Sequence, residues 1–214
     1  MTSQGSLSSL AAARIAVKAL LDGGVRHVVI SPGSRSAPMA YALAEAEAAG
    51  NVRLLVRIDE RSAGFTALGL ALSTGAPAAV LTTSGTAVGN LLPAVMEANH
   101  AAVPLVVLSA DRPAELHGTG ANQTTIQLDL FGDHVRFAVD IAAGSNPKRA
   151  VETAIYAATG ALADTPPGPV QLNLAFREPL VPEPGEALPA TKGHGVFHYD
   201  SGPQPLSMPP LPLN

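Results

Sequence analysis

The sequence predicts an α/β domain with a doubly wound, mostly parallel six-stranded sheet and helices on both faces. Short apolar runs, typical of buried parallel strands, alternate along the chain with longer segments of helical spacing. Hydrophobic residues make up 47% of the 214 residues but aromatic residues only 4%, so Ala, Val, Leu and Ile must build the core. A chain of this length buries about 70% of its unfolded surface in one domain.

The first half of the chain contains three strand and helix pairs. Ser8 or Ser9 is a plausible cap for a first helix, which Gly23-Gly24 would end. Pro38 suits the first turn of the second helix, because that position needs no backbone N–H. The expected elements are a strand at 27–30, a helix at 38–49, a buried strand at 54–58, a helix from Glu60 to about 74 and a strand at 78–82.

The second half continues the alternation and then changes character. Nine of the 19 prolines lie in residues 175–214, where few apolar positions recur with a period. We therefore expect an α/β domain over 1–175 and a Pro-rich linker over 176–214. The expected elements are a helix at 87–99, a strand at 105–108, a strand at 135–141, a helix at 148–162 and a strand at 170–174.

Charge and composition exclude several classes of function. Lys and Arg number 13 against 17 Asp and Glu, without a basic run, which argues against nucleic acid or a membrane surface as partner. The absence of cysteine excludes disulfides and thiolate metal sites, and the six histidines lack zinc-ligand spacing outside a tail pair. No apolar run approaches the length of a membrane span, and no signal peptide is recognisable, so we expect a cytoplasmic protein.

Glu60 is the first candidate for proton chemistry. It follows the strand expected at 54–58 and opens a small, apolar helix, so apolar walls could raise the pKa of its carboxyl group. A partly protonated carboxylate can share a hydrogen bond with a ring nitrogen of a cofactor. The alternative is structural: Asp59 caps the helix and Glu60 only offsets the helix dipole.

The loops after three other strands carry polar residues at the edge where α/β sheets bind ligands. Ser34 and Arg35 follow the first strand, and Arg112 follows the fourth; two arginines converging there would suit a substrate with carboxylates. The alternative for each arginine is an ordinary exposed side chain. Further candidates are the turn Thr83, Ser84 and Gly85, which could cradle a phosphate or a polar ring edge, and the amides Asn122 and Gln123, which could bind hydroxyl groups.

The segments Glu60 to Ala71 and Pro77 to Asn90 resemble the pyrimidine-binding domain of thiamine diphosphate enzymes. In that superfamily a glutamate at a helix start contacts the aminopyrimidine, and a Thr-Ser-Gly turn ending in Gly-x-Asn follows one βα unit later. The resemblance therefore assigns Glu60, Thr83, Ser84, Gly85 and Asn90 to the cofactor.

Three further motifs narrow the resemblance. Residues 31–38 (SPGSRSAP), 109–113 (SADRP) and 121–124 (ANQT) are similar to those of the 2-succinyl-5-enolpyruvyl-6-hydroxy-3-cyclohexene-1-carboxylate synthases of menaquinone biosynthesis. Those enzymes decarboxylate 2-oxoglutarate and add the resulting carbanion equivalent to isochorismate. By resemblance Glu60 is catalytic, since it holds the aminopyrimidine in the tautomer that deprotonates the thiazolium carbon. Ser34, Arg35, Arg112, Asn122 and Gln123 would line the isochorismate side.

The resemblance also implies parts that this sequence lacks. Members of the family carry middle and diphosphate-binding domains, the latter with a Gly-Asp-Gly motif for Mg²⁺, and no Gly-Asp-Gly occurs here. We therefore expect an N-terminal piece that is inactive alone, and a homodimer or homotetramer for the complete protein. Two alternatives remain: the pyrimidine-domain subunit of a split decarboxylase, and a non-enzymatic carboxylate-binding module.

Overall fold

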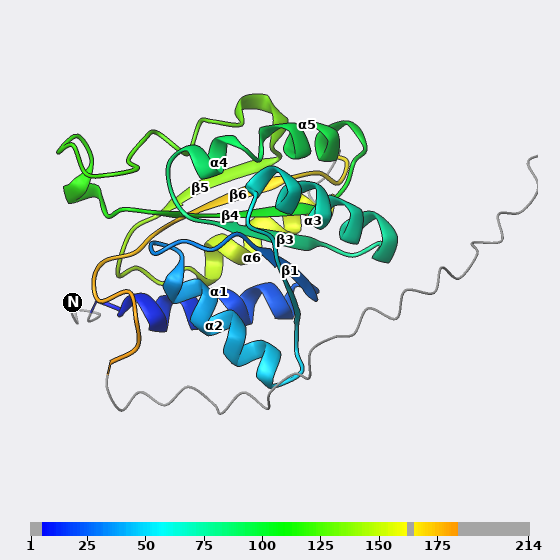
Figure 1. Cartoon of the computed structure of the whole chain (residues 1–214). Coiled ribbons are helices and arrows are strands. Elements are labelled where there is room, and N and C mark those ends of the chain that lie inside the picture. The colour runs from blue at the N-terminus through cyan, green and yellow to red at the C-terminus, as the bar shows by residue number, and fades with distance from the viewer. Residues whose placement is uncertain (1–5, 162–164, 184–214) are drawn as a thin grey trace, which may run out of the picture.

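A computed structural model describes residues 6–161 and 165–183, which form a three-layer α/β domain (Figure 1). Its six strands are all parallel, in the order β2-β1-β3-β4-β6-β5. This confirms the predicted fold class. The strands are β1 (His27–Ile30), β2 (Arg53–Val56), β3 (Ala78–Thr82), β4 (Leu105–Asp111), β5 (Phe137–Ile141) and β6 (Val170–Ala175).

Helices cover both faces of the sheet (Figure 1). On one face α1, α2 and α6 pack with one buried cluster, and on the other α3 and α5 pack with a second. The helices are α1 (Ser9–Asp22), α2 (Ala37–Ala48), α3 (Glu60–Thr74), α4 (Thr86–Gly89), α5 (Leu92–His100) and α6 (Lys148–Ala158). Short 3-10 turns occur at Ala114–Leu116 and Gly132–His134.

Local chemistry sets the helix boundaries. The Ser8 hydroxyl accepts a hydrogen bond from the backbone N–H of Ala11 at 3.2 Å, and α1 ends at Gly23 as predicted. Gly75, with φ of +64°, ends α3 in the left-handed conformation that glycine adopts without a steric penalty. These caps satisfy backbone groups that the helices themselves leave unpaired.

The core consists mainly of small aliphatic side chains, as the composition predicts. The strands β3 and β4 are buried along their whole length because the sheet flanks them on both sides and helices cover both faces. The larger fully buried apolar side chains include Leu20, Met39, Leu81, Leu91, Leu105, Leu108, Leu172, Phe131 and Phe176.

The structure corrects three details of the prediction. The strand expected to be buried at 54–58 is the edge strand β2, and Val56 and Ile58 are 58% and 81% exposed. The helix expected at 87–99 is two helices, because Pro93 lacks a backbone N–H and fits only the first turn of α5. The helix expected at 148–162 ends at Ala158, and Leu162 lies outside the described residues.

The residues that follow β6 pack against the domain. Phe176 and Leu180 are 2% and 9% exposed and belong to the core, although the linker was predicted to start at residue 176. The Ser9 hydroxyl donates a hydrogen bond to the carbonyl of Arg177 at 2.5 Å, which ties this segment to α1. Residues 184–214 of the predicted linker lie outside the described residues. Within residues 6–161 and 165–183, no helix has the length and apolar character to cross a membrane.

Candidate cofactor and substrate site

The candidate site lies where the winding direction of the sheet reverses. The chain passes from β1 to β2 on one side and returns to β3 on the other, so a crevice opens at the carboxyl ends of β1 and β3. The loop 31–36 follows β1, and the turn 83–85 follows β3. These loops touch, because a Cβ atom added to Gly33 would lie 2.3 Å from the Cβ atom of Thr83.

Glu60 stands at the start of α3. Asp59 caps this helix by accepting a hydrogen bond from the N–H of Ser62 at 2.8 Å, and this bond lowers the pKa of the Asp59 carboxyl group. Asn90, the residue that ends α4, donates a hydrogen bond from Nδ2 to Oε2 of Glu60 at 3.0 Å. Capping therefore falls to Asp59, and Glu60 is oriented by a second side chain with Oε1 left available to a ligand.

The apolar walls expected around Glu60 do not enclose it within the described residues. Val56 and Ile58 precede it along the chain, but both side chains are exposed. Phe65 and Leu72, on the outer face of α3, are also exposed, at 43% and 58%. Glu60 is half-buried, and the apolar side chains that precede it face solvent instead of forming a pocket around its carboxyl group.

The Thr-Ser-Gly turn is more deeply buried than its proposed cofactor contacts require. Thr83 and Ser84 are 8% and 0% exposed. The Ser84 hydroxyl faces inward, where it accepts a hydrogen bond from Nη1 of Arg112 at 2.5 Å. Gly85 has φ of +79°, and its N–H donates to Oε1 of Gln127 at 2.7 Å. Among these three residues, Gly85 is the one that borders the adjacent cavity.

A cavity of about 680 Å³ opens beside this turn. It brings together four of the predicted residues, Gly85, Asn90, Asn122 and Gln123. Gln123 has φ of +56° and its backbone packs 3.0 Å from the position that a Gly85 Cβ would take. The remaining lining residues are Thr86, Gly89, Thr124, Thr125 and Leu130. Glu60 is not among the lining residues and is linked to this cavity through its hydrogen bond with Asn90.

Arg112 connects the turn at 83–85 to the loop that carries Asn122 and Gln123. Its Nη1 atom donates to Oγ of Ser84 and, at 3.0 Å, to the carbonyl of Gln123. Its side chain also borders a smaller cavity of about 130 Å³ with His117, Asp140 and Arg177. The prediction that Arg112 projects near the carboxyl end of a central strand agrees with its place directly after β4.

Arg35 lies at the same edge, close enough to Arg112 for the two charges to interact. Its side chain is 12% exposed, and Nη1 donates to the carbonyl of Phe176 at 2.9 Å and lies 3.7 Å from Oε1 of Glu178. Burial, followed by the charge of nearby Arg112, lowers the pKa of this guanidinium. Its Nε atom is buried without a hydrogen-bond partner, and the side chain borders none of the described cavities. Ser34 is exposed.

A buried polar network below the site escaped the sequence prediction. Asn173 receives hydrogen bonds at Oδ1 from Gln127 at 2.7 Å and from Ser109 at 2.9 Å. Through Nδ2 it donates to Asp111 and Asp140, both at 2.9 Å. The sequence did contain a clue to this network: Gln171 and Asn173 lie within the predicted strand 170–174. A strand buried on both faces normally carries apolar residues at every position, so two amides there indicate buried polar partners.

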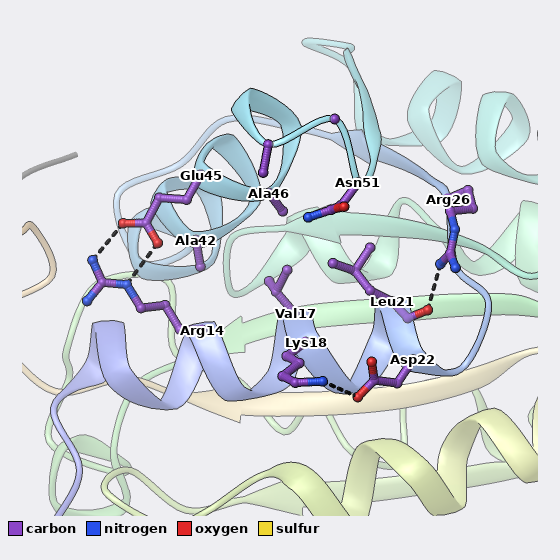
Figure 2. A pocket seen from close by; sticks show the side chains of 12 residues that line it. Arg14, Val17, Lys18, Leu21, Asp22, Arg26, Ala42, Glu45, Ala46 and Asn51 are labelled. Carbon is purple, nitrogen blue, oxygen red and sulfur yellow. Dashed lines mark hydrogen bonds and ion pairs between the residues drawn. The ribbon is translucent and has the colours of Figure 1, made fainter. Parts of the chain in front are cut away.

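A second large cavity, of about 670 Å³, lies far from this edge, between α1 and α2 (Figure 2). Arg14 pairs with Glu45 at 2.6 Å and Lys18 with Asp22 at 2.6 Å, while Arg26 donates to the carbonyl of Leu21 (Figure 2). The opposite charges in its wall thus bind each other, and nothing there marks a ligand. No group of three His, Cys, Asp or Glu that could hold a metal ion occurs within residues 6–161 and 165–183.

The comparison with protein families defines the class of the chain. Residues 10–132, more than half of the sequence, match the model of the thiamine pyrophosphate enzyme, N-terminal TPP binding domain. The chain therefore belongs to this family, as the resemblance predicted.

Individual relatives carry one shared name, 2-succinyl-5-enolpyruvyl-6-hydroxy-3-cyclohexene-1-carboxylate synthase. The protein of Paenarthrobacter aurescens is 82% identical over 209 residues, which are 98% of this chain and 37% of that protein. The protein of an Arthrobacter species is 77% identical, over 97% of this chain and 35% of its own length. That of Mycobacterium avium is 52% identical, over 86% and 36%. The chain thus spans little more than a third of these relatives.

Proposed function

We propose that this chain is the pyrimidine-binding part of a 2-succinyl-5-enolpyruvyl-6-hydroxy-3-cyclohexene-1-carboxylate synthase, with 2-oxoglutarate and isochorismate as substrates. The observation that carries the proposal is the hydrogen bond between Glu60 and Asn90, which lines the cavity beside the turn at 83–85, in a chain 82% identical to a protein of that name. When bound, thiamine diphosphate supplies the nucleophilic carbon and the electron sink for decarboxylation.

Glu60 serves as the catalytic residue in this proposal. Asn90 fixes one carboxylate oxygen of Glu60. The other oxygen then has a defined orientation, and in this proposal it accepts a hydrogen bond from a ring nitrogen of the aminopyrimidine. Gly85 has no side chain, which lets the turn pack closely against the backbone of Gln123 at the edge of the cavity that Asn90 lines. Thr83 and Ser84 support the turn from inside rather than contact the ring, because both side chains are buried.

Arg35 and Arg112 serve the carboxylates of isochorismate. The unpaired Nε of Arg35 and the low exposure of its guanidinium favour an anionic ligand, because a buried donor gains more from a charged acceptor than an exposed donor does. Asn122 and Gln123 border the cavity and supply amide groups for the ring hydroxyl. Ser34 adds an exposed hydroxyl beside Arg35.

Mg²⁺ and the diphosphate group are held, in this proposal, outside residues 6–161 and 165–183. Hard cations need several oxygen ligands together, and the described residues offer no cluster of three acidic or imidazole groups. A homodimer or homotetramer would complete the site: the chain exposes four apolar side chains on β2, on α3 and between them, namely Val56, Ile58, Phe65 and Leu72, which are suited to contact with another protein surface.

The test is turnover of 2-oxoglutarate and isochorismate by the complete enzyme that contains this sequence, with thiamine diphosphate and Mg²⁺. We expect Glu60→Gln to reduce kcat by at least about 100-fold, since proton transfer by a placed side chain contributes on that order. Asp59→Asn is the matched control, because Asn also caps helices and the change removes a neighbouring charge, so kcat should stay within about twofold. Near-normal turnover by Glu60→Gln would refute its role. A wild-type enzyme that binds isochorismate without turnover would instead favour the carboxylate-binding module.

A further inference from the structure

Gln127 connects the buried polar network to the surface turn of the candidate site. Its side chain is 2% exposed and borders none of the described cavities. Oε1 accepts from the N–H of Gly85 at 2.7 Å, while Nε2 donates to Oδ1 of Asn173 at 2.7 Å and to the carbonyl of Ala110 at 3.2 Å. Each end of the carboxamide therefore has a different and complementary partner.

The network continues from Gln127 to Arg112. Nδ2 of Asn173 donates to Oδ2 of Asp111 at 2.9 Å, and the other oxygen of Asp111 accepts from the backbone N–H of Arg112 at 2.7 Å. The Arg112 guanidinium in turn binds Ser84, the neighbour of Gly85. The hydrogen bonds thus form a closed ring that begins and ends in the same turn.

This ring of hydrogen bonds holds the turn at 83–85 in place against Gln123 and Arg112, two of the residues proposed to bind isochorismate. Gly85 packs against the backbone of Gln123, and Arg112 donates to the carbonyl of Gln123, so a shift of the turn would move both. Buried hydrogen-bonded networks define one arrangement because a broken bond leaves a polar group without a partner. Gln127 is the member that joins the interior to the turn.

We propose that Gln127 is a positioning residue for isochorismate: it sets the placement of Arg112 and Gln123 through Gly85 without touching the substrate. The inference rests on the proposed function of these two residues. It concerns isochorismate in particular, since the ring includes Arg112 and contacts Gln123 but bypasses Glu60 and Asn90.

Gln171 provides a matched control. It is likewise buried, at 0% exposed, and donates from Nε2 to Ser109 and to the carbonyl of Gln127. Its described contacts stay inside the network and do not reach the turn. Gln127→Met and Gln171→Met each remove one buried carboxamide at nearly constant volume, so both should lower the Tm, and only the first should disturb the turn.

The experiment compares the two variants in the complete enzyme. We expect Gln127→Met to raise the KM for isochorismate about tenfold and to leave the KM for 2-oxoglutarate within about twofold. Gln171→Met should leave both KM values within about twofold. Equal effects of the two variants on the KM for isochorismate, or no effect of Gln127→Met, would overturn the inference.

Gln127→Glu covers the case in which the Met variant does not fold. The ionised carboxylate would face the Asn173 and Ala110 oxygens, whereas its protonated form can donate to Asn173 as Gln does. The KM for isochorismate should therefore fall toward the wild-type value between about pH 8 and about pH 6, because burial raises the pKa of such a carboxyl group. A KM for Gln127→Glu that follows the wild-type pH profile would contradict the inference.

One readout does not depend on the proposed function. In the 214-residue chain, the exchange rate of the Gly85 amide hydrogen is measured in each variant and divided by the wild-type rate. We expect this ratio to be at least about 100-fold larger for Gln127→Met than for Gln171→Met. Unchanged exchange at Gly85 would overturn the positioning role by itself. If exchange and folding behave as expected but the wild-type enzyme does not convert isochorismate, the proposed function fails instead.

Discussion

The Nδ2 atom of Asn90 lies 3.0 Å from Oε2 of Glu60, so the residue that ends α4 orients the carboxylate that begins α3. The two residues are 30 positions apart in the sequence and meet because Glu60 follows β2 and Asn90 follows β3 at the same edge of the parallel sheet. A carboxylate fixed at one oxygen presents the other in a defined direction, which is what a hydrogen bond to a cofactor ring requires.

Asn90→Ala should lower kcat of the complete enzyme by about three- to tenfold, because Glu60 loses the hydrogen bond that orients it. Asn90→Asp should lower kcat further, since it replaces a donor with a second negative charge beside Glu60. Steady-state kinetics with both substrates measures the effect. Asn51→Ala, at an exposed residue on the far side of the domain, is the control and should leave kcat unchanged. Equal kcat values for Asn90→Ala and the wild type would show that Asn90 does not orient Glu60 for catalysis.

Glu178 lies where it would compete with a substrate carboxylate for Arg35, if Arg35 binds isochorismate as proposed. The two side chains lie 3.7 Å apart, and Glu178 is 70% exposed while Arg35 is 12% exposed. Glu178→Gln should therefore lower the KM for isochorismate by about two- to threefold, because the guanidinium keeps its position and loses a competing anion. Glu183→Gln, at another exposed carboxylate of the same segment, should have no effect. A raised KM in Glu178→Gln would mean that Glu178 holds Arg35 in place for binding.

The ion pair between Arg177 and Glu115 gives a pH dependence with a defined sign. Nε of Arg177 donates to Oε1 of Glu115 at 2.6 Å, and this bond lowers the pKa of the Glu115 carboxyl group below its ordinary value of 4.5. The unfolded chain then binds more protons at this group than the folded chain, so the stabilisation is present above the ordinary pKa and is lost as the pH falls through the lowered one.

Arg177→Gln should lower the Tm at neutral pH by no more than about 2 °C, because both side chains are half exposed and the pair is weakly stabilising. The difference from wild type should disappear at a pH below both pKa values and shrink in high salt. Thermal unfolding monitored by circular dichroism over a pH series measures this. A difference that persists under strong acid would assign the effect to packing of the Arg177 side chain.

The fold was predictable because the spacing of apolar residues in the sequence indicates which side chains face the core and therefore which segments are strands or helices. β1 and β3 have the predicted bounds, and all six strands and their parallel sense were expected. The edge position of β2 was not predicted. Apolar residues such as Leu54 and Leu55 occur both in edge strands and in central strands, so they do not show how many neighbours a strand has. Strand order depends on long-range pairing, which local composition does not encode.

The candidate site was predictable only in its surface residues. The loops after β1, β3 and β4 carry the predicted polar side chains, and the structure brings Asn90, Asn122 and Gln123 to one cavity. The inward orientation of Ser84 and the role of Gln127 depend on hydrogen bonds between residues 28 and 42 positions apart. Such pairings follow from the assembled fold and leave no pattern in the neighbouring sequence.

Gly33 keeps the loop after β1 in contact with the turn after β3. A Cβ atom at this position would lie 2.3 Å from the Cβ atom of Thr83 and 2.7 Å from its Cγ2 atom, so Gly33→Ala must push the two loops apart. We expect this change to reduce the free energy of unfolding by about 1–3 kcal/mol and to raise the KM for isochorismate, since Arg35 follows two residues later. Urea unfolding measures the first effect and steady-state kinetics the second. Gly69→Ala is the opposite control for stability in the 214-residue chain: its added Cβ meets open space within α3, so it should stabilise the chain by about 0.5–1 kcal/mol. If Gly33→Ala were as stable as Gly69→Ala and kept the wild-type KM for isochorismate, the two loops would not depend on their close contact.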